Sequence, residues 1–200
     1  KIALGTVQFG IDYGVNSVDG QVRPEEVKKI LSYAHSKNID LLDTAPAYGN
    51  SEKILGRMDI SNFKVVTKTR HFDSLEIKNT DVKLLNKDFH HSLKDLKQNS
   101  VYGVLIHDAD DLLKPGAEKL FDKLQELKQA EKIVKIGVSV YDHSQLQSIL
   151  DNFSIDLVQL PFNILDRRMI DSGMLATLRG KGVEVHARSV FLQGLLLMSE

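Results

Sequence analysis

Four side chains with the chemistry to move one proton come from three separate parts of the sequence. Asp43 and Tyr48 are five residues apart, and Lys68 and His107 each follow a later apolar segment. A phenol has a pKa of about 10, and a nearby ammonium lowers that pKa. We predict that Lys68 supplies this ammonium and that Asp43 orients it as an ion pair. Tyr48 then gives a proton to a carbonyl oxygen that neutral His107 holds by a hydrogen bond.

Other kinds of catalysis fit this set of residues less well. No Ser or Thr is placed as in a hydrolase triad, so a nucleophile–base pair is missing from the pattern. Proton donation coupled to hydride transfer from a bound nicotinamide fits better. A Schiff base on Lys68 is a further interpretation, and it requires a buried Lys68 that is free of Asp43.

Seven short apolar segments must position these side chains. Polar residues stand at or near the carboxyl ends of six of them: Asp43, Lys68, His107, Ser139, Gln159 and Arg188. Segments with apolar residues at helical spacing separate them, which indicates βα units and a parallel sheet. The predicted strands span residues 1–6, 39–43, 63–67, 102–106, 134–138, 155–160 and 183–188.

Two parallel architectures compete for this pattern. A doubly wound sheet usually has a G-x-G-x-x-G turn after its first strand, and residues 5–10 read GTVQFG instead. A (β/α)₈ barrel places catalytic groups at the ends of several different strands, as here. We therefore predict a single barrel domain over residues 1–200. Because a barrel needs eight strands, we expect its eighth βα unit to be missing from this C-terminally incomplete chain.

The composition excludes several classes of partner. The 200 residues carry a net charge of −1 and no cysteine, and they contain no long apolar run. We therefore predict a soluble, cytoplasmic protein that binds neither nucleic acid nor membrane. H-E-x-x-H is absent, and we expect no metal site. Asp108, Asp110 and Asp111 are interpreted as a solvated acidic loop, and Asp166 as an ion-pair partner of the following arginines. The sequence does not indicate the oligomeric state.

Residues 43–52 read DTAPAYGNSE, and Leu55-Gly56 follows them. This segment resembles the signature of the aldo-keto reductases around their catalytic Asp and Tyr. The sequences VVTK (65–68) and LIH (105–107) are similar to the strands that carry the family's Lys and His. KIGVS (135–139) and LVQ (157–159) resemble the strands whose Ser and Gln hold the nicotinamide carboxamide. The segment 189–195 is like the loop that passes the cofactor pyrophosphate.

The resemblance implies a (β/α)₈ barrel that reduces an aldehyde or ketone with NADPH, although NADH is not excluded. It implies that Tyr48 is the acid and that Asp43, Lys68 and His107 support it. The residues that it implies for cofactor binding are Gly5, Thr6, Asp43, Ser139, Gln159, Arg188, Ser189, Leu192, Gln193 and Gly194. Two positions depart from the family pattern. Val140 replaces an Asn that touches the carboxamide, and Arg188 replaces an aromatic ring that stacks on the nicotinamide, although a guanidinium also stacks.

A second interpretation belongs to a different class of protein. The chain could be a regulatory barrel that binds a nucleotide but has little turnover, and the changes at Val140 and Arg188 leave this open. The intact set of four proton-transfer residues argues against it. For the enzyme, the polar segments 12–22 and 108–114 weakly favour a sugar-like carbonyl substrate.

Overall fold

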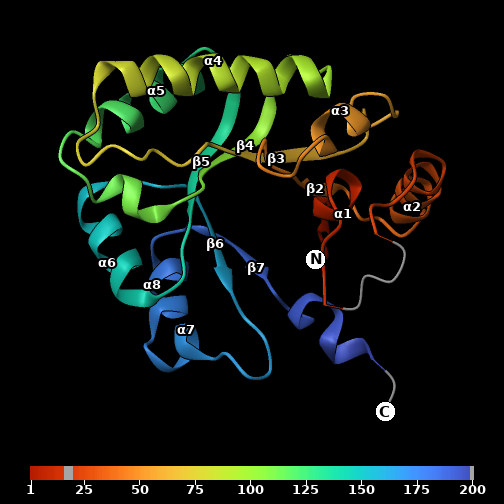
Figure 1. Ribbon diagram of the computed structural model, residues 1–200. Coiled ribbons are helices and arrows are strands. Elements are labelled where there is room, and N and C mark those ends of the chain that lie inside the picture. The colour runs from red at the N-terminus through yellow and green to blue at the C-terminus, as the bar shows by residue number, and fades with distance from the viewer. Residues whose placement is uncertain (16–19, 199–200) are drawn as a thin grey trace.

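The computed structural model describes residues 1–15 and 20–198 of the protein. Within them the chain forms one curled parallel sheet with the strand order β1-β2-β3-β4-β5-β6-β7 (Figure 1). All six pairs of neighbouring strands are parallel. The strands are β1 (Leu4–Gly5), β2 (Leu41–Asp43), β3 (Lys64–Lys68), β4 (Val101–Ile106), β5 (Ile133–Ser139), β6 (Leu157–Pro161) and β7 (Glu184–Arg188).

Helices connect successive strands, as parallel pairing requires. They are α1 (Val7–Gly10), α2 (Pro24–Ser36), α3 (Ser51–Leu55), α4 (Asn79–Leu96), α5 (Glu118–Gln129), α6 (His143–Asn152), α7 (Arg168–Asp171) and α8 (Met174–Gly180), with the 3₁₀ helices η1 (Ala109–Leu112) and η2 (Leu192–Leu197). Pro24 occupies the first turn of α2, where a missing N–H costs nothing. Asn38 follows its end with a left-handed φ of 58°, a conformation that asparagine tolerates.

Apolar residues pack on both faces of the sheet. The larger cluster lies between the strands and the helices and contains residues such as Leu42, Ile106 and Leu120. A smaller cluster of Val66, Leu105 and Leu157 packs separately from it. Side chains of adjacent residues alternate between the two faces of a strand. The two clusters therefore hold the strands from both sides and fix the direction of the polar residues at the strand ends.

The predicted set of seven parallel strands is confirmed, but the first strand was predicted too long. It is only two residues long, and residues 7–10 form the helix α1. Asn50 precedes α3 without a capping hydrogen bond from its side chain, and its Oδ1 accepts a hydrogen bond from Gln21 Nε2 at 2.8 Å. Strands β1 and β7 form the edges of the sheet in the described part of the chain. The eighth βα unit stays a prediction.

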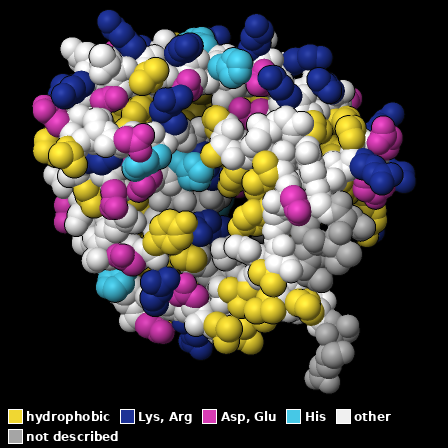
Figure 2. All heavy atoms as spheres, viewed as in Figure 1, with side chains coloured by type: hydrophobic (Ala, Val, Ile, Leu, Met, Phe, Trp, Pro, Cys, Tyr) yellow, Lys and Arg dark blue, Asp and Glu magenta, His cyan; other side chains and the backbone are white. Residues whose placement is uncertain are grey.

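The segment that follows α1 runs beside η2, near the C-terminal end of the described chain (Figure 1). Val15 N donates to Gln193 O at 3.2 Å, which ties the segment after α1 to η2. Figure 2 shows hydrophobic side chains gathered beside the C-terminal trace, where Phe191, Leu197 and Met198 of the η2 region are exposed. Among the helices that the structure describes, none has both the length and the apolar character needed to cross a membrane.

Candidate active site

The polar residues predicted at the strand ends do meet at one rim of the sheet. Asp43, Lys68, Ser139 and Arg188 are the last residues of β2, β3, β5 and β7, and His107 directly follows β4. All strands run in the same direction, so their carboxyl ends lie together. The sequence pattern therefore located the rim correctly.

Asp43 and Lys68 form the predicted ion pair. Lys68 Nζ lies 2.7 Å from Asp43 Oδ1 and also donates to Thr44 O at 2.9 Å. The Lys68 side chain is 1% exposed and that of Asp43 is 17% exposed. Gln159 Nε2 donates to the same Asp43 oxygen at 2.8 Å, so two donors hold the carboxylate. A buried Lys68 bound in this way contradicts the Schiff-base interpretation, which required a lysine free of Asp43.

Tyr48 lies beside this ion pair. Lys68 Nζ is 4.8 Å from the centroid of the Tyr48 ring. The rings of Tyr48 and His107 are nearly perpendicular, at 85°, with their centroids 6.3 Å apart. The four residues predicted to act on one proton are therefore neighbours in space.

Two glycines hold the Tyr48 loop against α1. A Cβ atom on Gly10 would lie only 1.6 Å from the carbonyl oxygen of Tyr48, and one on Gly49 would lie 2.6 Å from the Gly10 carbonyl oxygen. Gly49 also has a left-handed φ of 60°. Behind the loop, Ser51 Oγ donates to Thr6 O at 2.9 Å. The position of the phenol thus depends on close backbone contact, which the sequence showed only as isolated glycines.

Burial dominates the pKa of Tyr48. Desolvation raises this pKa above its usual value, and the smaller effect of Lys68 lowers it. The prediction that Lys68 brings the pKa below its usual value is therefore wrong for the net shift, although the effect of Lys68 has the expected sign. Burial and then Lys68 lower the pKa of His107. At neutral pH the site therefore presents a protonated phenol beside a neutral imidazole.

A cavity of about 1290 Å³ borders these groups, with residues of the β1, β7 and η2 regions in its wall. Figure 2 shows a hollow near the middle of this face. Tyr48 lines the cavity together with the strand-end residues Asp43, His107, Ser139, Gln159 and Arg188. Its size is sufficient for a small ligand or part of a cofactor. Among the described residues, no group of three or more His, Cys, Asp or Glu side chains could hold a metal ion.

Ser139 and Gln159 suit a carboxamide group. They pair across β5 and β6, and both are buried, with 4% and 5% exposure. The amide nitrogen of Gln159 is already bound to Asp43, so its carbonyl oxygen is the group that can accept from a ligand amide. The Ser139 hydroxyl can donate to a ligand carbonyl. This donor–acceptor set fits the nicotinamide carboxamide without any change of side-chain type.

The remaining predicted cofactor residues divide into two groups. Gly5, Ser189, Gln193 and Gly194 line the cavity. The Thr6 side chain is instead fully buried, and its hydroxyl donates to Asp43 O at 2.9 Å, which joins β1 to β2. The structure therefore places Thr6 outside the cavity wall.

The segment from Ser189 to Gly194 is tightly coiled. Leu192, Gln193 and Gly194 have φ values of 48°, 57° and 95°, and Ser189 has a φ of 59°. Leu192 is not among the residues that line the cavity. Its predicted role at the cofactor stays a prediction, and the structure gives it no direct support.

Glu52 is a buried acid in the first turn of α3, to which the sequence analysis assigned no role. It is 5% exposed and accepts from Thr67 Oγ1 at 2.6 Å. Burial raises the pKa of Glu52, and hydrogen bonds from Thr67 and Ser92 oppose this rise. The carboxyl group thus joins the helix after the Tyr48 loop to the strand that carries Lys68.

The acidic segment after β4 is only in part the solvated loop that was predicted, because Asp110 is exposed and Asp108 is half-buried but Asp111 is not solvated. Asp111 is completely buried, accepts from Phe72 N at 3.2 Å and pairs with Lys114 at 2.7 Å. Asp108 Oδ1 accepts from Asp110 N at the start of η1 and Asp108 Oδ2 lies 2.9 Å from His71 Nδ1. Asp111 therefore anchors the loop, because a buried carboxylate needs partners. The contacts of these acids do not support a role in binding a sugar.

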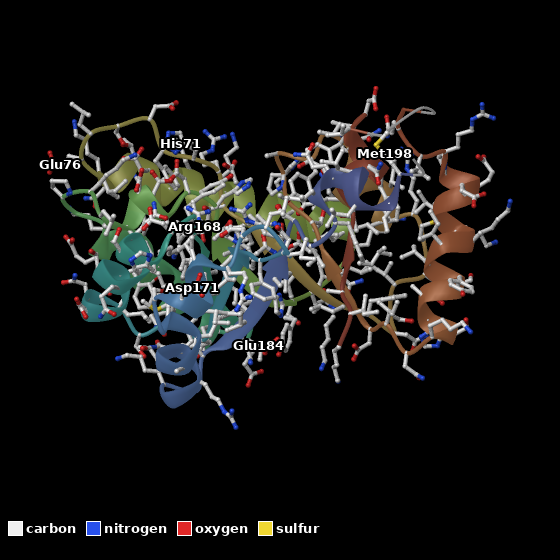
Figure 3. The ribbon with its side chains drawn as sticks, turned by 90° about the horizontal axis from the view of Figure 1, so that it is seen from below. His71, Glu76, Arg168, Asp171, Glu184 and Met198 are labelled. Atoms are coloured by element: carbon white, nitrogen blue, oxygen red, sulfur yellow. The ribbon has the colours of Figure 1, made fainter. Side chains whose placement is uncertain are left out.

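A second charged cluster lies at the amino-terminal end of β7. Figure 3 shows Glu184 and His71 on opposite sides of the molecule. Partial burial favours a higher pKa for Glu184, but hydrogen bonds from Lys135, Tyr102 and His186 outweigh this effect and lower the pKa to about 2. These bonds connect β7 to β4 and β5, so the cluster serves the cohesion of the sheet.

Residues 1–200 match the sequence profile of the Aldo/keto reductase family. The chain belongs to this family. It is 29% identical over 209 residues to the oxidoreductase SirO of Leptosphaeria maculans, an alignment that covers 100% of this chain and 62% of SirO. It is 30% identical over 216 residues to the NADH-specific methylglyoxal reductase of Escherichia coli K12, with 98% and 65% coverage. The chain therefore spans less than two thirds of the length of both curated relatives.

The fold is also shared with solved members of the family. A holo-form aldo-keto reductase from Bacillus halodurans superposes with a TM-score of 0.76 at 20% identity, covering 98% of this chain and 63% of that one. At this identity the similarity concerns the fold. The curled parallel sheet of this aldo/keto reductase therefore has the arrangement of strands seen in that structure.

Proposed function

We propose that the protein reduces an aldehyde or ketone to an alcohol with NADPH or NADH, and that Tyr48 is the general acid. The observation that carries the proposal is the buried Asp43–Lys68 pair, with the ammonium 4.8 Å from the Tyr48 ring and His107 beside that ring. We also propose that residues 1–200 form one barrel-type domain, since one continuous sheet runs through the chain.

Each side chain has a distinct role in this proposal. His107 is neutral, so its imidazole can donate a hydrogen bond to the carbonyl oxygen and fix its position. Tyr48 retains its proton, because burial raises its pKa, and transfers it to that oxygen as negative charge develops. Lys68 stabilises the resulting phenolate, and Asp43 keeps the ammonium in place. A nicotinamide cofactor held by Ser139 and Gln159 supplies the hydride that reaches the carbonyl carbon.

The relatives leave the choice of nucleotide open. The E. coli relative is named as NADH-specific, whereas the family resemblance favours NADPH. Both cofactors should therefore be tested. The substrate class suggested by the polar segments has little support, because residues 16–19 lie outside the described residues and the acids of 108–114 make structural contacts.

Replacing Tyr48 by phenylalanine tests the proposed acid. We expect the Tyr48→Phe variant to lose at least about 100-fold in kcat, the lower range for general acid catalysis, with the Kd for NADPH changed by less than about threefold. Tyr33→Phe is a matched control, because Tyr33 is 65% exposed on the helix α2. Cofactor fluorescence gives the Kd and consumption of NADPH gives kcat. Normal turnover by the Tyr48 variant would refute the mechanism, and cofactor binding without reduction of any carbonyl would favour the regulatory barrel.

A further inference from the structure

Arg188 places a fixed positive charge in the cavity wall. It ends β7 opposite Pro161 of β6, and its backbone oxygen accepts from Phe162 N at 3.1 Å. Its guanidinium carbon lies 4.2 Å from the centroid of the Tyr141 ring, and Nη2 donates to Val140 O at 3.2 Å. The stacked ring and the carbonyl hold the guanidinium on one side, which limits the entropy lost when a ligand binds.

No carboxylate of the described chain forms a salt bridge with this arginine. The salt bridges among the described residues do not include Arg188. The nearby acid Asp166 is already bound to Arg168 through two hydrogen bonds, at 2.9 Å and 2.7 Å. In addition, Arg188 Nε is shielded from solvent and has no hydrogen-bond partner in the described part of the chain. A buried donor without a partner is costly, and an oxygen that reached it would remove that cost.

The charges beside Arg188 make it the uncompensated group at the rim. Lys68 is paired with Asp43, and the pKa of His107 is lowered, so the imidazole is neutral. A guanidinium offers parallel N–H donors that match the two oxygens of a carboxylate. An anionic group that enters this part of the cavity therefore gains both charge pairing and directed hydrogen bonds.

We propose that Arg188 binds the carboxylate of an anionic carbonyl substrate, so that the protein prefers aldehyde acids or oxo acids to neutral carbonyls. The inference rests on the proposed reductase function, and it specifies the substrate class for that site. Phosphate oxygens of the cofactor offer similar chemistry and are the competing source of the anion. The predicted contact of Arg188 with the nicotinamide uses the flat face of the guanidinium. The carboxylate would use the edge of the guanidinium, so the two contacts are compatible.

Matched substrate pairs test this proposal on the full polypeptide with saturating NADPH. Succinic semialdehyde is compared with butanal, and 4-carboxybenzaldehyde with benzaldehyde. For the unmodified protein we expect kcat/KM to be at least about tenfold higher for the anionic member, as expected for a hydrogen-bonded charge pair. In Arg188→Met the ratio of the two kcat/KM values should fall to about 1. Because the ratio compares two substrates on the same variant at saturating NADPH, an effect of the substitution on cofactor binding cancels. Equal kcat/KM values in the unmodified protein would overturn the proposal.

Two other variants separate specific binding from general charge effects. Arg179→Met removes an exposed positive charge from the helix α8, leaves the Asp166–Arg168 pair intact and should retain the preference for anions. Arg188→Lys keeps the charge but loses the paired donors, and it should lower the preference about three- to tenfold. It also keeps the test decisive if the methionine variant does not fold, which far-UV circular dichroism reveals. An unchanged preference in Arg188→Lys, or an equal loss of preference in Arg179→Met and Arg188→Met, would refute the specific role.

Binding measurements distinguish the cofactor from the substrate as the source of the anion. If Arg188→Met weakens NADPH binding tenfold and slows both members of each pair equally, Arg188 serves a cofactor phosphate and the proposal is wrong. If no carbonyl is reduced at all, the proposed function fails separately. In that case calorimetry with 4-carboxybenzyl alcohol and benzyl alcohol still tests Arg188. Tighter binding of the acid that depends on Arg188 supports the site, and equal binding overturns it.

Discussion

Replacing Asp43 by asparagine would leave the buried Lys68 ammonium without its carboxylate. At the observed separation of 2.7 Å and an effective dielectric constant of about 20, the gross attraction between the two charges is about 6 kcal/mol. The desolvation of both groups cancels much of this gain, and breaking a buried pair costs about 3–5 kcal/mol. We expect about 3 kcal/mol for Asp43→Asn, because the asparagine oxygen can still accept from Lys68.

The reverse substitution should cost less. In Lys68→Met the remaining carboxylate is 17% exposed and still accepts from Gln159, so we expect a loss of about 2 kcal/mol. The double variant has no unpaired buried charge. It should therefore lose about 2 kcal/mol in total, which gives a coupling energy of about 3 kcal/mol between the two residues.

Urea denaturation at pH 7, followed by far-UV circular dichroism, measures these free energies of unfolding. For a chain of this size, a loss of about 3 kcal/mol corresponds to a fall of about 6–12 °C in Tm, which gives an independent check. The reasoning would be refuted if the two single-variant effects added within about 0.5 kcal/mol, because residues that do not interact behave in this way. It would also be refuted if Asp43→Asn were as stable as the unmodified protein.

Three further predictions concern groups around the site. Burial raises the pKa of Glu52 from 4.5, so the folded state holds the Glu52 proton more tightly than the unfolded chain does. The stability that this proton contributes is full below pH 4.5 and is lost as the pH rises through the raised pKa. Urea titrations from pH 4 to 8 should therefore show a smaller decline for Glu52→Gln than for the unmodified protein, and parallel declines would contradict this. The pKa of Glu184 is lowered to about 2, so its contribution is present above pH 4.5 and is lost between pH 4.5 and about 2. Glu184→Gln should cost about 1 kcal/mol at pH 7, since the group is partly solvated, and almost nothing near pH 2, as thermal unfolding at both pH values would show. Gly10→Ala forces the Tyr48 loop to move, so kcat should fall at least about tenfold while the Kd for NADPH stays within threefold; full activity would mean that the loop adapts without cost.

The sequence was sufficient for the parts of the site that depend on local pattern. The alternation of short apolar segments with helical ones is enough to indicate a parallel sheet, and in such a sheet polar residues at strand ends must share a rim. The sequence alone therefore places Asp43, Lys68, His107, Ser139 and Gln159 together at this rim.

Contacts between distant segments could not be predicted in this way. Nothing near Glu52 in the sequence indicates that Thr67 will bury and bind it, and the acids around Asp111 look like a solvated loop until Phe72 and Lys114 pack against them. The first strand was also predicted too long, because a segment of two residues carries too little periodicity to mark its bounds.

The sequence by itself determined which chemical groups stand at the strand ends, because strand periodicity and motif spacing are local properties of the chain. The tertiary structure decided how those groups behave. Burial raises the pKa of Tyr48 more than Lys68 lowers it, and only the packed fold determines how much water each group loses. The same packing sets Arg188 on Tyr141 without a carboxylate partner among the described residues. Desolvation and charge pairing depend on the whole three-dimensional environment, so they are not encoded in any single segment.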